Sequence, residues 1–216
     1  MAPSGNHKLA WLLLSLLACR GPSNDSSVVK MPVGSSPQRG PSTAWVTVIE
    51  FADYGCEFCR GEEAVLANVR SAYGADLRIV FKNFPQSDAA EAAAIAAECA
   101  HEQGQAQFWH MHDLLLQSGL DPNAIAADAS QVSNLDLNKW QMCLNSPAPA
   151  TTVANDAAVG KSVGINRTPT LIVNGELVVG STSESDLSAR IDRERAKAEA
   201  SGVSCINYYD QVVLGE

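Results

Sequence analysis

Two cysteines, Cys56 and Cys59, have the spacing of a redox-active pair. They follow the apolar run 45–51, which predicts a strand buried on both faces, and they begin a segment with helical spacing. On the first turn of a helix, this spacing brings the two sulfurs within disulfide range. The unpaired amides and the helix dipole favour the thiolate of Cys56, which is the attacking species in disulfide exchange. Cys59, one turn deeper, would be the resolving thiol.

The same two cysteines could instead form a structural disulfide or half of a zinc site. A zinc site needs two more ligands at suitable spacing, and the sequence has no second Cys-x-x-Cys. A pair that follows a buried strand and opens a helix is typical of redox proteins. We therefore expect redox use, with no metal and no cofactor.

The apolar pattern around the pair predicts an α/β protein. Residues 45–85 read as a strand–helix–strand unit, which is the signature of parallel strand pairing. Residues 86–163 have helical spacing and no strand pattern, so we expect an all-helical insert.

The β pattern returns after the helical insert. Two apolar runs flank Asn174-Gly175, which predicts a hairpin because both turn positions require positive φ. A final helix is expected from Ser183 to about residue 202. Residues 28–33 predict a short edge strand, and residues 203–216 form a tail that the pattern does not place.

Composition narrows the class of protein. The chain has 216 residues, of which 46% are hydrophobic and 18% charged, as in ordinary globular proteins. Its net charge of −9 argues against nucleic acid as a partner, because binding to phosphates needs a basic face. Six cysteines are too few for a fold of this size held together by disulfides alone.

The N-terminus has the layout of an export signal. Residues 1–18 contain a polar start, an apolar stretch and a small residue before Cys19. Residues 16–19 resemble a bacterial lipobox, which implies cleavage before Cys19 and lipidation of its sulfur; the alternative is an ordinary secretory signal. Residues 19–27 would then be a flexible tether. We expect a mature protein on the periplasmic side of the bacterial cell envelope, anchored by lipid, where disulfides persist.

The order of motifs resembles the DsbA-like thioredoxin-fold family of exported thiol:disulfide interchange proteins. The resemblance rests on Cys56-Glu57-Phe58-Cys59, on Thr168-Pro169-Thr170 before the hairpin, and on the helical insert between them. It implies an α/β thioredoxin fold with an inserted all-helical domain. Residues 28–85 and 164–202 would form the thioredoxin-like domain, and residues 86–163 the insertion.

The resemblance also implies roles for three residues outside the pair. Pro169 matches a cis-proline, next to which the backbone of Thr168 can bind a substrate peptide as an added strand. Glu50 matches a buried acid below the active site that relays the proton of Cys59. Lys82 on the neighbouring strand is a possible partner of Glu50. The chain departs from the family in carrying Glu57-Phe58 where the oxidant has Pro-His, and the charge of Glu57 disfavours a thiolate at Cys56.

Further cysteines and histidines lie in the predicted insert. Cys99 and Cys143 each fall on the apolar face of a predicted helix, where they could be inert buried thiols. An oxidising compartment favours a disulfide between them instead, which would resemble the second disulfide of some family members. Cys205 would then be left as an unpaired thiol. His110 and His112 face different ways on one helix, so we expect surface or packing roles rather than a metal site.

The leading hypothesis is an exported thiol–disulfide oxidoreductase that exchanges a Cys56–Cys59 disulfide with protein substrates, most simply as an oxidant. Its partners would be exported proteins with thiols or disulfides, and a membrane redox partner that resets it. The alternatives are a reductase or isomerase of the cell envelope, and a tethered binding or chaperone module with a structural disulfide. A cysteine hydrolase would need a histidine near Cys56, and all histidines of the mature chain fall in the insert.

Overall fold

The computed structural model describes residues 28–216. The predicted signal peptide, Cys19 and the tether lie outside the described residues. Within the described part, no helix is both long enough and apolar enough to span a membrane.

A five-stranded mixed sheet forms the centre of the structure, in the order β1-β3-β2-β4-β5. β2 and β3 are parallel, and every other neighbouring pair is antiparallel. The strands are β1 (Gln38–Arg39), β2 (Val46–Ala52), β3 (Leu77–Asn83), β4 (Thr170–Val173) and β5 (Glu176–Val179).

β2 is the central strand, and all seven of its residues are buried. Its side chains alternate between two separate cores. Val46 and Val48 pack on the face covered by α1 (Glu57–Tyr73) and α7 (Glu184–Ala200). Ile49 and Phe51 pack on the opposite face. Burial on both faces explains why this strand reads as a continuous apolar run rather than an alternating one.

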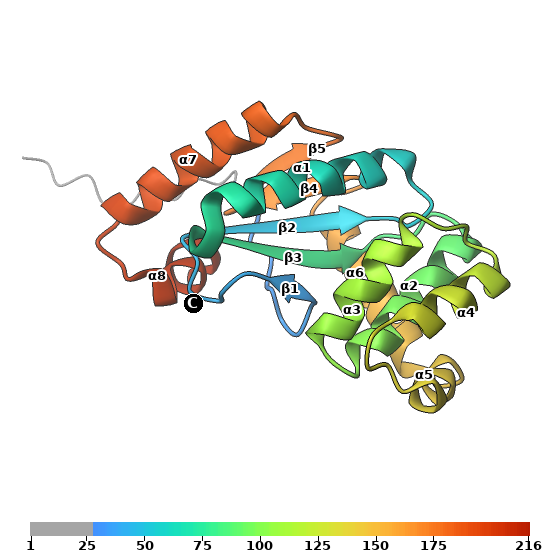
Figure 1. Cartoon of the computed structure of the whole chain (residues 1–216). Coiled ribbons are helices and arrows are strands. Elements are labelled where there is room, and N and C mark those ends of the chain that lie inside the picture. Colours follow the sequence, from blue (N-terminus) through green and yellow to red (C-terminus); the bar gives the residue numbers. More distant parts are fainter. Residues whose placement is uncertain (1–27) are drawn as a thin grey trace, which may run out of the picture.

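The two long helices lie side by side over one face of the sheet (Figure 1). Cys56 is the N-cap residue of α1 and Gly74 its C-cap residue, which has a positive φ of 54° and begins a 3-10 turn, Gly74–Asp76. α7 begins as predicted: the side chain of Ser183 accepts a hydrogen bond from the amide of Asp186 at 3.1 Å.

A second group of helices is inserted in the chain between β3 and β4, and it lies at the end of the sheet toward which β2 runs (Figure 1). It contains its own apolar core, to which Phe81 of β3 and Tyr54 contribute from the sheet side. A disulfide between Cys99 and Cys143 joins two of its helices. The helices are α2 (Asp88–His101), α3 (Gln105–Leu115), α4 (Pro122–Gln131), α5 (Leu137–Leu144) and α6 (Ala148–Ser162). The predicted thioredoxin fold with an all-helical insertion is confirmed.

The structure corrects the sequence analysis at both ends of the described chain. Residues 28–33 form no strand; the edge strand next to β3 is β1, and the other edge strand is β5. The C-terminal residues, which the pattern did not place, form α8 (Cys205–Tyr208) and a π-helical turn, Tyr209–Leu214. They close the core beneath the sheet, where the hydroxyl of Tyr209 donates to the carbonyl of Met31 at 2.7 Å.

Candidate active site

The two cysteines lie where β2 ends and α1 begins, as predicted. A tight turn joins the elements, in which the side chain of Asp53 accepts a hydrogen bond from the amide of Gly55 at 2.6 Å. Cys56 is the N-cap residue of α1, and its sulfur accepts a hydrogen bond from the amide of Cys59 at 3.4 Å. Both are free thiols in this structure.

The two thiols have different surroundings. Cys56 is half-buried, whereas Cys59 is fully buried. Burial raises the pKa of the Cys59 thiol well above its ordinary value, and the hydrogen bond with Cys56 raises it further. Cys59 is therefore held as a thiol, and Cys56 is the sulfur that both water and the helix N-terminus can reach.

A loop from far along the chain completes the site. The peptide bond between Thr168 and Pro169 is cis, as expected. The sulfur of Cys56 lies 3.6 Å from the carbonyl oxygen of Thr168. The loop is fixed on both sides, because the side chain of Gln86 donates to the hydroxyl of Thr168 at 3.1 Å and the amide of Gly180 donates to the carbonyl of Pro169 at 2.9 Å.

An aromatic residue lies between the two cysteines in the sequence. Phe58, between the two cysteines, is 69% exposed although it is large and apolar. Its neighbour Glu57 is also exposed and lies in the first turn of α1. An exposed ring of this size beside a half-buried thiol gives a partner chain an apolar surface to contact.

Glu50 lies in β2 on the face covered by α1, and its side chain is fully buried. Burial raises its pKa well above the ordinary value, and the nearby Glu63 raises it further. The predicted pairing with Lys82 is wrong. Lys82 stands beside Phe51 in the parallel ladder, so it points to the opposite face, where it pairs with Asp156 at 3.0 Å.

The structure adds residues that the sequence analysis missed. His112 was expected in a surface or packing role, yet it is fully buried and hydrogen-bonded at both nitrogens. Its Nε2 lies 2.9 Å from Glu63, and its Nδ1 lies 3.1 Å from the hydroxyl of Tyr54. Glu63 could have been found, because it is one helical turn after Cys59 on the same face of α1. The contact with His112 could not, because it joins two segments that no local pattern relates.

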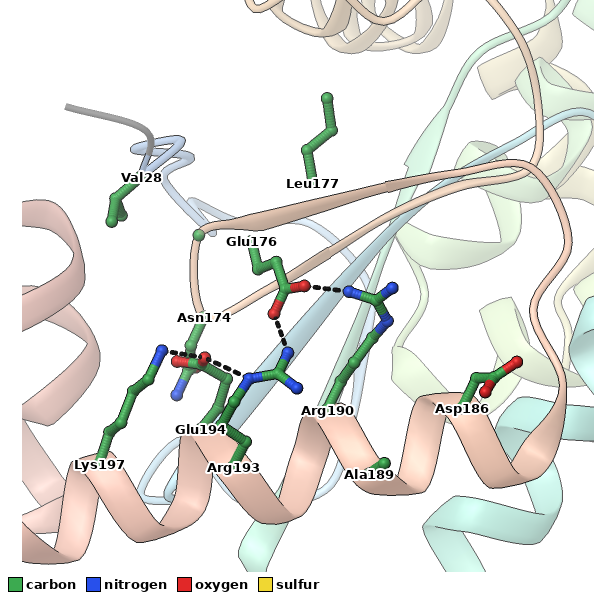
Figure 2. Close-up of a pocket in the computed structure, with 11 residues that line it drawn as sticks. Val28, Asn174, Glu176, Leu177, Asp186, Ala189, Arg190, Arg193, Glu194 and Lys197 are labelled. Atoms are coloured by element: carbon green, nitrogen blue, oxygen red, sulfur yellow. Dashed lines mark hydrogen bonds and ion pairs between the residues drawn. The ribbon is translucent and has the colours of Figure 1, made fainter. Parts of the chain in front are cut away.

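A surface pocket of about 800 Å³ lies away from this site, between the β4–β5 hairpin and α7 (Figure 2). It is at the other end of β2, since the amide of Asn174 donates to the carbonyl of Thr47 there. Glu176 pairs with both Arg190 and Arg193 of α7. Glu176 and Glu194 are thus paired with the basic residues of α7, and no cysteine lines the pocket.

Comparisons with known proteins agree with this fold. The family model described as Thioredoxin matches residues 33–193. A crystal structure of a thioredoxin-like oxidoreductase from Silicibacter pomeroyi is 28% identical and superimposes with a TM-score of 0.69, covering 81% of this chain and 99% of the other. The thiol-disulfide exchange protein alpha-DsbA2 from Wolbachia pipientis is 19% identical, with a TM-score of 0.68 over 74% of this chain and 87% of its own.

Curated relatives are longer proteins. The Na(+)/H(+) antiporter NhaA 3 from Salinispora tropica is 32% identical over an alignment 208 residues long, which covers 88% of this chain but 31% of the antiporter. The chain therefore spans about a third of the length of the curated relatives it matches. The antiporter name describes those whole proteins, whereas the similarity concerns a segment of them.

Proposed function

The chain belongs to the thioredoxin family, and we propose that it is a thiol–disulfide oxidoreductase that exchanges a Cys56–Cys59 disulfide with cysteines of other proteins. The observation that carries the proposal is the position of Cys56. It caps α1, its sulfur accepts the Cys59 amide at 3.4 Å, and it lies beside the Thr168 carbonyl. The Cys59 amide is a donor that suits a thiolate at Cys56, and the Thr168 contact places this sulfur next to backbone that a peptide can bind.

The direction we propose is oxidation of substrate dithiols. Cys56 caps α1, where the amide of Cys59 donates to its sulfur, and the positive end of a helix dipole favours a negatively charged sulfur. This effect favours the reduced pair over the disulfide. A disulfide whose reduced form is stabilised is a stronger oxidant. Glu57 opposes this effect with one exposed negative charge, which water screens.

The reaction we propose has two steps. A substrate thiolate attacks the sulfur of Cys56, the Cys56–Cys59 bond breaks, and the electron pair leaves on Cys59. A second substrate thiolate then attacks the mixed disulfide, which releases the oxidised substrate and the thiolate of Cys56. In the first step Cys59 must gain a proton, because burial disfavours its thiolate. Glu50, buried beneath α1 with a raised pKa, is the acid that we assign to this transfer.

The partners follow from the surface around Cys56. An extended segment of a substrate protein can add as a strand along the backbone at Thr168, and the exposed ring of Phe58 offers it an apolar contact. A catalytic cycle also needs a membrane redox partner that oxidises the pair again. We further propose that the protein is exported to the cell envelope and anchored by lipid on Cys19, which the signal-like pattern of residues 1–19 supports.

Equilibration with glutathione tests the activity. The protein is incubated with defined ratios of reduced and oxidised glutathione, quenched in acid, alkylated and mapped by mass spectrometry. We expect reversible formation of a Cys56–Cys59 disulfide, with a potential above that of the glutathione pool. A potential below that of the pool would make the protein a reductase. A pair that never oxidises, or that glutathione never reduces, would contradict exchange and favour a binding module.

A further inference from the structure

A groove lies beside the active site, between α1 and the segment that joins β5 to α7, and we call it the α1 groove. Its volume is about 360 Å³. The segment begins next to the cis-proline loop, because the amide of Gly180 donates to the carbonyl of Pro169 at 2.9 Å. On the helix side the groove begins at the residue that follows Cys56. A chain bound at Thr168 therefore lies close to it. The lining residues include Glu57, Phe58, Gly61, Glu62, Val65 and Thr182.

Both charged side chains that line the α1 groove are acidic. Glu57 is exposed on the first turn of α1. Glu62 is only 1% exposed, and its Oε2 accepts a hydrogen bond from the amide of Thr182 at 2.9 Å. Its Oε1 has no hydrogen-bond partner among the described residues. A buried carboxyl oxygen without a partner costs free energy, and the last torsion of a glutamate is soft enough for this oxygen to turn toward a donor in the groove.

Gly61 keeps the α1 groove open where a side chain would fill it. It lies in the interior of α1, where glycine destabilises a helix relative to alanine. Apart from its chain neighbours and the backbone of its own helix, a Cβ atom added there would meet nothing within 4 Å. The packing of the described residues therefore does not require a glycine at this position. The close approach of a bound group to the helix does require one.

The walls of the α1 groove are apolar on the helix side. Phe58 is 69% exposed, and Val65 lies about two helical turns after Glu57. An aromatic ring beside acidic groups suits a cation, because the face of the ring attracts positive charge. Lysine and arginine combine a long apolar stem with a cationic head. They match both the apolar wall and the acids, whereas an acidic side chain would be repelled.

We propose that the α1 groove binds a lysine or arginine side chain of the substrate protein, close in sequence to the cysteine that reacts with Cys56. The proposal rests on the function proposed above and names its substrate class. Glu57 and Glu62 attract the cationic head. Phe58 and Val65 pack against the apolar stem. The helical wall of the groove is about 12 Å long, which equals about four residues of an extended chain, so the basic residue falls within about four positions of the cysteine.

Reaction rates with dithiol peptides test this proposal. The oxidised protein is mixed with peptides that carry two cysteines and one variable residue, which is placed one to four positions before or after the first cysteine. The variable residue is Lys, Glu or Met, and Met supplies a long apolar chain without charge. Quenching in acid followed by alkylation times the loss of the Cys56–Cys59 disulfide. Each rate is divided by the rate of the same peptide with hydroxyethyl disulfide, which corrects for the reactivity of the peptide thiols.

At the best position we expect the corrected rate of the Lys peptide to exceed that of the Glu peptide by at least about tenfold. It should exceed that of the Met peptide by about threefold. Both ratios should decrease as the ionic strength rises, because salt screens the acids.

Variants of the groove separate its contribution from the negative charge of the whole protein. In Glu57→Gln/Glu62→Gln the ratio of the Lys to the Glu rate should fall to within about twofold of one. In Gly61→Leu the added side chain fills the groove, so the ratio should fall likewise, while thermal unfolding shows that the variant is folded. Glu184→Gln is the matched control. Glu184 is exposed two residues after Thr182 but does not line the groove, and its replacement should change the ratio by less than about twofold.

The proposal fails if the native protein exchanges with dithiothreitol but reacts with the Lys and Glu peptides at equal corrected rates. It also fails if the Met peptide reacts as fast as the Lys peptide, because the groove would then select apolar side chains. A preference for Lys that persists in Gly61→Leu, or that Glu184→Gln abolishes as fully as Glu57→Gln/Glu62→Gln, would assign the preference to charge outside the groove. Native protein that exchanges with neither dithiothreitol nor any peptide would instead overturn the proposed function.

Discussion

The sulfur of Cys56 lies 3.6 Å from the carbonyl oxygen of Thr168, although 112 positions separate the two residues in the sequence. The surroundings of the reactive thiol therefore come from two chain segments, the start of α1 and the loop before β4. Neither segment forms a site alone: the helix supplies the amides that face the sulfur, and the loop supplies backbone that a substrate can pair with.

The first prediction concerns the order in which the thiols react. Cys56 is half-buried at a helix N-terminus, whereas Cys59 is fully buried with a raised pKa. With limiting iodoacetamide at pH 7, we expect Cys56 to be alkylated at least about tenfold faster than Cys59. Mass mapping over time measures both sites in one sample. Comparable rates at the two sites would contradict their assigned roles.

The second prediction concerns stability and pH. Folding raises the pKa of Glu50 above its ordinary value of 4.5, so the folded protein binds this proton more tightly than the unfolded chain does. The contribution of Glu50 to stability is complete at low pH and is lost as the pH rises from about 4.5 toward the raised pKa. Glu50→Gln mimics the protonated acid, and we expect it to stabilise the protein at pH 8 by about 1–3 kcal/mol.

Denaturant unfolding of both proteins between pH 5 and 8 measures this effect. The gain in Glu50→Gln should grow with pH. Glu91→Gln provides a control, because Glu91 is exposed on α2 and its replacement should change the free energy of unfolding by less than about 0.5 kcal/mol. A gain in Glu50→Gln that is constant over the whole range would show that Glu50 keeps its ordinary pKa.

The sequence was sufficient for the parts of the fold that depend on local patterns. The buried run of β2, the hairpin at Asn174 and the cap of α7 at Ser183 are present as predicted. Local periodicity and turn chemistry determine these elements. The motif order also located the cysteines beside Pro169, because the family resemblance relates segments that no periodicity connects.

The remaining errors arise where side chains meet across elements. Lys82 was paired with Glu50 because the two lie on adjacent strands, but their register puts them on opposite faces of the sheet. His112 was assigned a surface or packing role, and its hydrogen bonds with Glu63 and Tyr54 were not foreseen because these partners come from other segments. The C-terminal tail is short and shows no long period, so its packing beneath the sheet depends on a surface that only the fold creates.

The third prediction concerns the second disulfide. The Cys99–Cys143 bond joins α2 to α5 and closes a loop with a sequence separation of 44. Replacing both cysteines with Ala should lower the free energy of unfolding by about 3–4 kcal/mol, because the unfolded chain gains freedom. Glutathione exchange at Cys56 should be unchanged within about twofold, since the bond lies in the helical insert. A large loss of exchange with unaltered stability would contradict a structural role.

The fourth prediction concerns the anchor, which lies outside the described residues. The lipobox-like residues 16–19 predict that lipid is attached to Cys19. Cys19→Ala should move the protein from the membrane fraction to the soluble fraction of the cell envelope and leave thiol exchange unchanged. Cell fractionation followed by immunodetection measures this. An unchanged membrane fraction would show that Cys19 is not the point of attachment.

The most direct test of the account is the trapping of covalent complexes through the two active-site cysteines. Cys59→Ala and Cys56→Ala are each expressed in an oxidising compartment, in a Cys205→Ala background that removes the remaining free thiol of the described residues. The complexes are then separated by non-reducing electrophoresis. Cys59→Ala should accumulate mixed disulfides through Cys56, because no resolving thiol remains, and Cys56→Ala should trap almost none, because Cys59 is buried. Equal trapping by the two variants, or none by either, would contradict the assignment of Cys56 as the sulfur that exchanges with substrate.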